Sequence, residues 1–209
     1  MKEPRIPFTL SSERKPLKPP RKKKTLIVQS VFNVEYWPFD QPMPRKLLPG
    51  PHGNDKIPDV PNFSWVEYGM RTGFPRIVQA LKSRGLPAST TINASVIDVY
   101  PRAAEVMLEN KWEFMGHGFT QRNMQKVENE REDIQKTTAA IVAATGKRPR
   151  GWLGPGLTET WETPDILSEE GYDYVCDWVV DDVPRWMSTR EGPLLAVPYN
   201  VEVNDSIIY

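Results

Sequence analysis

From residue 25 onward, short apolar runs typical of buried strands alternate with helical patterns, in units of roughly 30 residues. Parallel strands need such a crossover between them, and the crossover is right-handed, so this alternation predicts an α/β fold built on a parallel sheet. The predicted strands span residues 25–31, 88–94, 112–115, 151–153, 172–179 and 194–197. The predicted helices span residues 74–82, 101–110, 124–145 and 163–170.

Residues 36–68 separate the first predicted strand from the first predicted helix and show no sustained periodicity. A connection of this length inside a compact domain is usually functional or disordered. Aromatic side chains in the segment favour an ordered lid, and they include Trp37, Phe39, Phe63, Trp65 and Tyr68.

Charge is balanced over the whole chain but not along it. The 209 residues include 27 Lys and Arg and 27 Asp and Glu, yet residues 1–24 alone carry nine basic and two acidic side chains, with five prolines. This composition predicts a basic, Pro-rich, disordered arm over residues 1–24 and one folded domain over residues 25–209. The overall balance argues against a nucleic-acid partner.

Cysteine content and hydropathy exclude several classes of protein. The chain has one cysteine, Cys176, so an internal disulfide framework and a multi-cysteine zinc site are excluded. No apolar run reaches the roughly 18 residues of a membrane helix, and residues 1–24 lack the apolar core of a secretory signal. We therefore expect a cytoplasmic protein with no membrane partner.

Polar side chains follow the predicted strands at the points where those strands end. In parallel sheets the chemistry sits at the carboxyl ends of the strands, so these side chains are expected to meet on one rim. The rim would include Asn33, Glu35, Asn93, His117, Thr120, Gln121, Asp177, Trp178, Asp181, Asp182, Tyr199, Glu202, Asn204 and Asp205.

Six stretches of the chain form a recognisable series, namely Phe32–Trp37, Pro58–Trp65 with Glu67–Arg71, Gly116–Gln121, Arg148–Gly156, Asp177–Asp182, and Pro198–Tyr199 with Glu202–Asp205. In this order they resemble the polysaccharide deacetylase (NodB-homology, carbohydrate esterase 4) superfamily, most closely its cytoplasmic allantoinase-like branch. The resemblance implies a distorted (β/α) barrel that hydrolyses non-peptide carbon–nitrogen bonds, often in N-acetyl groups on sugars.

The chain departs from the family pattern at the positions that carry the chemistry. The resemblance places Asn33 where the family has its catalytic base and Glu35 where it has a metal-binding aspartate. It places His117 and Gln121 at the two metal-binding histidines, and Leu153 at the arginine that orients the base. An amide is not basic at neutral pH, so Asn33 cannot accept a proton from water.

Candidate site residues follow from the rim and from the resemblance. The catalytic candidates are Glu35, His117, Asn33 and Asp177. The substrate-binding candidates are Trp65, Trp152 and Trp178, as an aromatic wall that would suit a sugar or a planar ureide, and Glu202. For each tryptophan, a place in the core is the alternative.

Glu35, His117 and Gln121 are the candidate metal ligands. One carboxylate, one imidazole and one neutral amide form a poor set for Zn²⁺. The expected cofactor is therefore none, or a weakly held divalent metal such as Zn.

The leading hypothesis is a hydrolase in which water attacks an amide or ureide carbonyl with little or no metal. Glu35 or His117 would act as the base, and backbone N–H groups near His117–Gly118 and the Asn33 amide would bind the oxyanion. The expected partner is a small amide or ureide, or an N-acetylated sugar. The alternatives are a metal-dependent polysaccharide deacetylase and a catalytically degenerate protein that only binds a sugar or ureide.

The chain ends at Ser206–Tyr209, directly after Glu202–Asp205, and no closing helix follows. This predicts a barrel that is incomplete at its C-terminus, either because the chain is a fragment or because a partner chain covers the open side. An exposed edge strand promotes pairing with another chain, so a homo-oligomer or low solubility is expected.

Overall fold

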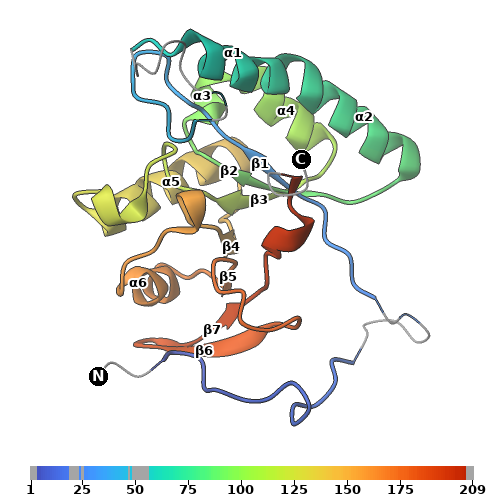
Figure 1. Ribbon diagram of the computed structural model, residues 1–209, viewed down its shortest axis with the longest axis vertical. Coiled ribbons are helices and arrows are strands. Elements are labelled where there is room, and N and C mark those ends of the chain that lie inside the picture. The colour runs from blue at the N-terminus through green and yellow to red at the C-terminus, as the bar shows by residue number, and fades with distance from the viewer. Residues whose placement is uncertain (1–3, 19–23, 25, 47, 49–56, 206–209) are drawn as a thin grey trace.

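The predicted alternation of strands and helices is present in the computed structural model, which describes residues 4–18, 24, 26–46, 48 and 57–205 (Figure 1). The strands are β1 (Val31–Val34), β2 (Ser89–Ile92), β3 (Glu113–Gly116), β4 (Gly151–Trp152), β5 (Tyr174–Val175), β6 (Arg185–Thr189) and β7 (Gly192–Ala196). The α-helices are α1 (Val60–Tyr68), α2 (Phe74–Arg84), α3 (Val96–Val99), α4 (Pro101–Glu109), α5 (Glu130–Thr145) and α6 (Thr163–Glu169). Short helical segments are η2 (Gly69–Gly73), η3 (Met124–Lys126), η4 (Pro155–Leu157) and η5 (Val201–Val203).

All seven strands form a single sheet in the order β1-β2-β3-β4-β5-β7-β6. Every neighbouring pair is parallel except β6 and β7, which form an antiparallel hairpin. The predicted α/β class and parallel sheet are therefore confirmed. Within the described residues no strand pairs β1 with the other end of the sheet, so the sheet is curved but not closed.

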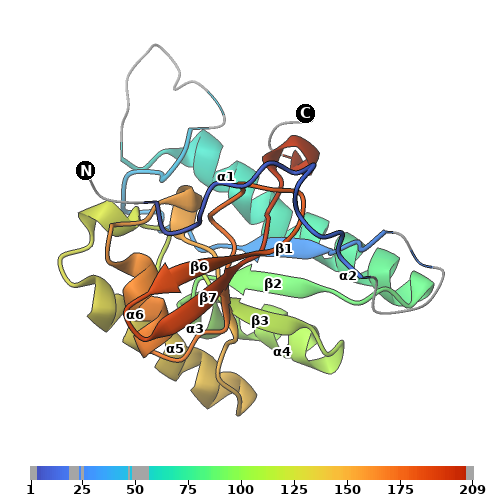
Figure 2. The same cartoon turned by 90° about the horizontal axis from the view of Figure 1, so that it is seen from below.

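The outer face of the sheet is covered by helices, which follow it in chain order from α2 beside β1 to α6 beside β7 (Figures 1 and 2). Around β1–β3, residues of α2 and α4 such as Leu81 and Met107 pack with Ile92 and Phe114. Around β4–β7, a second buried cluster contains Ile134, Trp152, Leu167 and Val175, among others. Burial of these apolar side chains holds the helices against the sheet.

The inner face carries the alternate residues of the same strands, because successive side chains in a strand point to opposite faces. A small buried cluster forms its centre and consists of Met115, Leu153, Cys176 and Val197. The ring of Tyr199 packs against this cluster. The inner face therefore leads from an apolar floor directly to the residues that follow each strand.

Part of the predicted basic arm contacts the domain. The backbone N–H of Ser188 in β6 donates to the carbonyl oxygen of Arg5, and Ile6 is buried in the cluster around β4–β7. Arg14 forms an ion pair with Asp181 at 3.0 Å. In Figure 1 this dark-blue segment runs beside β6. These contacts differ from those of a fully solvated arm, while the disordered arm and the division of the chain at residue 24 stay predictions.

The first strand and the long loop differ from their predictions. Pairing begins only at Val31, and the apolar side chains of Leu26, Ile27 and Val28 are 76%, 52% and 75% exposed rather than buried. The segment predicted as a lid ends in helix α1, which Asp59 caps by accepting from the Asn62 N–H. Residues 47 and 49–56 of that segment lie outside the described part of the chain.

Three smaller differences concern element ends. Helix α5 begins at Glu130 with Asn129 as its N-cap, instead of at residue 124, and α6 ends at Glu169 instead of at residue 170. Strand β5 is much shorter than residues 172–179, and β6 was not predicted. Along the described ranges, every helix is too short or too polar to cross a bilayer.

Candidate active site

The strand register brings the polar residues of the inner face to one level. Val34, Ile92 and Gly116 lie side by side in β1, β2 and β3, and Gly116 lies beside Trp152 in β4. The residues that follow them, which include Glu35, Asn93 and His117, therefore emerge together at the carboxyl ends of the strands. The predicted rim is present at these four strands.

Glu35 and His117 form the centre of this group. The Nε2 atom of His117 lies 3.3 Å from Oε1 of Glu35, although the two residues are 82 positions apart. The indole N–H of Trp37 donates to the other carboxylate oxygen, Oε2, at 2.7 Å. Both oxygens of Glu35 are thus held in place.

Both ring nitrogens of His117 have a hydrogen-bonding neighbour. Its Nδ1 atom lies 2.6 Å from the carbonyl oxygen of Leu153, which only accepts hydrogen bonds. Burial would raise the pKa of the Glu35 carboxyl, but His117, Trp37 and Arg45 together hold that pKa below its usual range. His117 therefore has one ring nitrogen beside the Leu153 carbonyl oxygen and the other beside the Glu35 carboxyl group.

Asn93 ties the loops around this pair together. Its amide nitrogen donates to the carbonyl oxygen of His117 at 2.5 Å and to Oε1 of Gln121 at 2.9 Å. Its amide oxygen accepts the backbone N–H of Tyr36 at 3.1 Å. The sequence predicts Asn93 on the rim but gives it no role. A buried amide that bonds its own loop to the loops after β1 and β3 can be recognised only in three dimensions.

The donor set does not fit a divalent metal. Glu35 and His117 bond to each other, and the amide oxygen of Gln121, the third predicted ligand, accepts from Asn93. Among the described residues no three His, Cys, Asp or Glu side chains are grouped closely enough to hold an ion. A metal would have to break both hydrogen bonds to acquire these ligands.

Asp177 acts on His117 through one peptide group. Both carboxylate oxygens of Asp177 lie within 2.9 Å of the Gly154 N–H. The same peptide group carries the Leu153 carbonyl oxygen that accepts from His117. The carboxylate, the peptide and the imidazole thus form one chain of hydrogen bonds that orients His117.

Two buried carboxyls lie close to each other beside this chain. Burial raises the pKa of Asp177 to about 7, against the Gly154 N–H and the charge of His117, which lower it. Burial and the charge of Asp177 raise the pKa of Glu159 to about 8. The indole N–H of Trp178 donates to Oε2 of Glu159 at 2.7 Å, while Oε1 of Glu159 is buried with no hydrogen-bond partner in the described structure.

Asn33 does not face the Glu35–His117 pair as a free amide. Its Oδ1 accepts the hydroxyl of Thr91 at 2.7 Å, and its Nδ2 donates to the hydroxyl of Tyr199 at 3.1 Å. Its predicted place on the rim is correct, but both ends of the amide already have partners.

The predicted substrate-binding residues lie apart from one another. Trp152 is fully buried in the core, so it is not part of an exposed aromatic wall. Trp178 is partly buried and bonded to Glu159, and Trp65 is 60% exposed on α1. Glu202, the fourth predicted substrate-binding residue, is exposed and accepts a hydrogen bond from Asn200.

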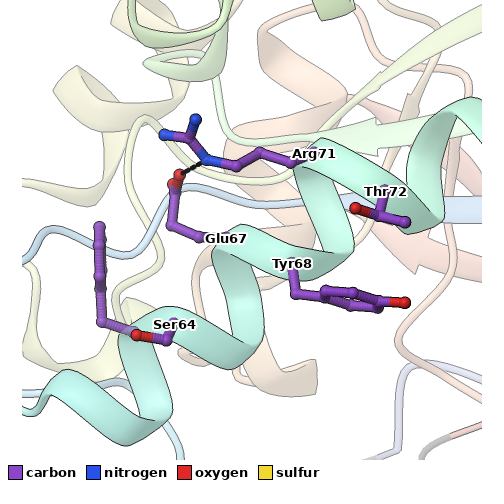
Figure 3. Close-up of a pocket in the computed structure, with 6 residues that line it drawn as sticks. Ser64, Glu67, Tyr68, Arg71 and Thr72 are labelled. Carbon is purple, nitrogen blue, oxygen red and sulfur yellow. Dashed lines mark hydrogen bonds and ion pairs between the residues drawn. The ribbon is translucent and has the colours of Figure 1, made fainter.

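A surface cavity of about 370 Å³ lies over α1 and η2 and is lined by Phe63, Ser64, Glu67, Tyr68, Arg71 and Thr72. Figure 3 shows the Arg71 side chain turned toward Glu67, with which it forms an ion pair at 2.7 Å, while Tyr68 points to the other side of the helix. Arg71 is largely exposed, and no lining residue belongs to the group around His117.

Comparison with known proteins places this geometry in a family. The family model described as polysaccharide deacetylase matches residues 63–175. A peptidoglycan deacetylase of Helicobacter pylori is 23% identical over 158 residues, which are 75% of this chain and 53% of that protein. The chain spans about half the length of the curated relatives it matches.

Two crystal structures share the fold. One is described as a probable polysaccharide deacetylase from Pseudomonas aeruginosa PAO1 and has a TM-score of 0.71 at 27% identity, covering 85% of this chain and 63% of that chain. The other, Puue allantoinase, has a TM-score of 0.70 at 26% identity, covering 85% and 62%. Because the family model matches more than half of the residues, the chain belongs to the polysaccharide deacetylase family.

Proposed function

We propose that the protein is a hydrolase of non-peptide carbon–nitrogen bonds in which Glu35 and His117 act as a base and acid pair. The observation that carries the proposal is the 3.3 Å contact between Nε2 of His117 and Oε1 of Glu35 at the carboxyl ends of the strands. Family membership and the likeness to an allantoinase support the reaction class.

In the proposed reaction, Glu35 accepts a proton from the attacking water while the water oxygen bonds to the substrate carbonyl carbon. His117 then donates its Nε2 proton to the leaving nitrogen as the carbon–nitrogen bond breaks. Transfer of a proton from Glu35 to His117 over their short separation restores both groups. Positioned proton transfer of this kind contributes about 10²–10⁴ in rate.

Asp177 has a positioning role in this scheme. By holding the Gly154 N–H it fixes the Leu153 carbonyl, which in turn fixes the tilt and the Nδ1 proton of His117. A positioned second partner of this kind determines which ring nitrogen faces the substrate. The proposal therefore keeps Glu35, His117 and Asp177 from the predicted catalytic set and moves Asn33 to a supporting place.

No step of the proposed reaction passes through a metal, because Glu35 and His117 are bonded to each other and Gln121 is bonded to Asn93. We expect activity to survive dialysis against a chelator and to change little when Zn²⁺ is added. Activity that disappears with chelator and returns with Zn²⁺ would favour the metal-dependent alternative.

The substrate classes we propose are an N-acetylated amino sugar first and a ureide second. The first is supported by the peptidoglycan deacetylase among the relatives, and the second by the allantoinase among the structural neighbours. Both classes present a carbonyl bonded to nitrogen, which is the group that a water activated by Glu35 would attack.

The test is hydrolysis of penta-N-acetylchitopentaose and of allantoin by the full chain in the presence of chelator. We expect the wild type to release acetate or open the ureide, and Glu35→Gln and His117→Gln to lose at least 100-fold in kcat. Glu109→Gln, an exposed carboxylate of α4, is the matched control and should behave as wild type. Equal rates for Glu35→Gln and the control would refute the proposal.

A further inference from the structure

A hydrolase that attacks a carbonyl needs a hydrogen-bond donor where the oxyanion develops. The Asn33 amide predicted for this task is bonded at both ends, to Thr91 and to Tyr199. Its partner Tyr199 reaches the site from the other end of the sheet, because it follows β7 while Asn33 belongs to β1. Four strands separate β1 from β7 in the sheet, so the hydrogen bond between Asn33 and Tyr199 connects segments from opposite sides of the curved sheet.

The hydroxyl of Tyr199 has its acceptor capacity filled. Its oxygen accepts Nδ2–H of Asn33 at 3.1 Å and Nδ2–H of Asn204 at 2.6 Å, and a phenol oxygen accepts two hydrogen bonds. What remains is its own proton. The described acceptor for that proton is Oδ1 of Asn33 at 3.4 Å, which is long for an O–H donor and belongs to the amide that already donates to Tyr199.

Tyr199 keeps this proton at neutral pH and lies near the base. Burial raises the pKa of the phenol, the amides of Asn33 and Asn204 lower it, and the charges of Asp205 and Glu35 raise it again. The net effect is a pKa above the usual value. Asn33, which donates to this hydroxyl, lies two residues before Glu35, so the Asn33 and Glu35 side chains point to the same face of the sheet.

We propose that the Tyr199 hydroxyl donates to the substrate carbonyl oxygen as this oxygen becomes an oxyanion, so that Tyr199 is a catalytic residue. This inference rests on the proposed function. As the water oxygen bonds to carbon and its proton passes to Glu35, the carbonyl π pair moves onto oxygen and is held by Tyr199 O–H. When the tetrahedral intermediate collapses, the pair returns, the carbon–nitrogen bond breaks and the amine takes its proton from His117.

This assignment gives Asn33 and Asn204 a shared purpose. Two amide N–H groups that donate to one phenol oxygen leave it no lone pair to accept from the substrate, so the hydroxyl can act only as a donor. Thr91 donates to the amide oxygen of Asn33, which turns the amide nitrogen of Asn33 toward Tyr199. Asn33, Asn204 and Thr91 are then positioning residues.

The experiment compares Tyr199→Phe with the wild type on penta-N-acetylchitopentaose, allantoin and 4-nitrophenyl acetate. Loss of one oxyanion donor lowers kcat by about 10²–10³, and we expect KM to stay within threefold. Tyr174→Phe is the matched control, because its hydroxyl donates to Glu113 at the opposite end of the strands, and it should keep wild-type rates.

Equal kcat values for the Tyr199→Phe and Tyr174→Phe variants would overturn the role of Tyr199 and leave the proposed function intact. A wild type that is inactive on all three substrates would overturn both. If Tyr199→Phe unfolds, incorporation of 3-fluorotyrosine at position 199 keeps the shape and lowers the phenol pKa. The alkaline limb of kcat should then move to lower pH, and a limb that does not move would overturn the assignment.

Discussion

The peptide group between Leu153 and Gly154 has both of its polar groups, the N–H and the C=O, hydrogen-bonded to side chains. Asp177 accepts its N–H and His117 donates to its carbonyl oxygen, so any shift of this one peptide reaches the imidazole ring. Position 154 must be glycine for this to occur. An added Cβ would lie 2.7 Å from Oδ1 of Asp177 and 2.6 Å from the backbone oxygen of Thr158, both too close for a real contact.

We therefore predict that Gly154→Ala displaces Asp177 and the Leu153 carbonyl, lowers kcat at least tenfold and destabilises the fold by about 1–3 kcal/mol. Gly73→Ala is the control, since a Cβ there has nothing within 4 Å and the residue lies in a helical segment where alanine is favourable. Steady-state kinetics and guanidinium unfolding measure the two effects. Wild-type kinetics for Gly154→Ala would show that the hydrogen bonds from Asp177 through this peptide group to His117 have no catalytic importance.

At the residue scale, sequence reasoning succeeded where the strand register decides the outcome. Glu35 and His117 follow parallel strands, so their proximity could be expected from chain position alone. The partners of Asn33 could not, because they depend on a tyrosine that crosses from the far end of the sheet. The fully buried place of Trp152 depends likewise on which face of β4 it occupies, and a two-residue strand has too little pattern to decide this.

At the scale of elements, the loops after β4 and β5 bring two carboxyls together. Asp177 and Glu159 have pKa values raised to about 7 and about 8, chiefly by burial. A carboxyl whose pKa is raised by folding stabilises the folded state in its protonated form. That stabilisation is full below the ordinary pKa near 4 and is lost as the pH rises through 7 and 8.

We predict that the free energy of unfolding falls steadily between pH 5 and pH 8.5 and that Glu159→Gln flattens this fall. The glutamine cannot ionise and is not repelled by the charge of Asp177, so the variant should exceed the wild type in stability at pH 8.5. Urea unfolding at several pH values is the measurement. Glu128→Gln, at an exposed position outside these loops, should keep the wild-type slope. A steeper slope for Glu159→Gln would contradict the assignment.

Most elements could be predicted where their boundaries carry a physical signal. Helix α2 ends at Gly85, which adopts the left-handed conformation with φ of 60°, and α5 ends at Gly146 with φ of 70°. The apolar run before β1 predicts a buried strand, but its side chains are exposed. A strand forms only where a neighbouring strand pairs with it, and hydrophobicity does not reveal whether one is present. The sequence signal also failed for α1, whose proline and aromatic residues hide any helical period.

At the scale of the whole molecule, the N-terminal segment binds elements that lie far from it along the chain. The guanidinium of Arg5 lies 2.6 Å from Asp165 in α6, and it donates to the carbonyl oxygens of Ser188 in β6 and Trp161. Asp165 is only 7% exposed, and Arg5 is the largest cause that lowers the pKa of its carboxyl. The composition of residues 1–24 favoured a solvated tail because charge counts do not reveal a buried partner 160 positions away.

We predict that Arg5→Ala lowers the free energy of unfolding by about 2–3 kcal/mol at pH 7, because it leaves the Asp165 carboxylate buried without its main partner. The pKa of Asp165 is lowered in the fold, so the stability that Arg5 provides is present above the ordinary pKa near 4. It disappears as the pH falls through the lowered value, and the variant and wild type should therefore converge in acid.

Arg102→Ala is the control, since Arg102 pairs with exposed glutamates of α4 and its loss should change stability little. Unfolding in guanidinium at pH 7 and at about pH 2 measures the difference. If Arg5→Ala were as stable as Arg102→Ala at pH 7, the segment would be a solvated tail as its composition suggests, and its contacts with α6 and β6 would contribute nothing to the fold.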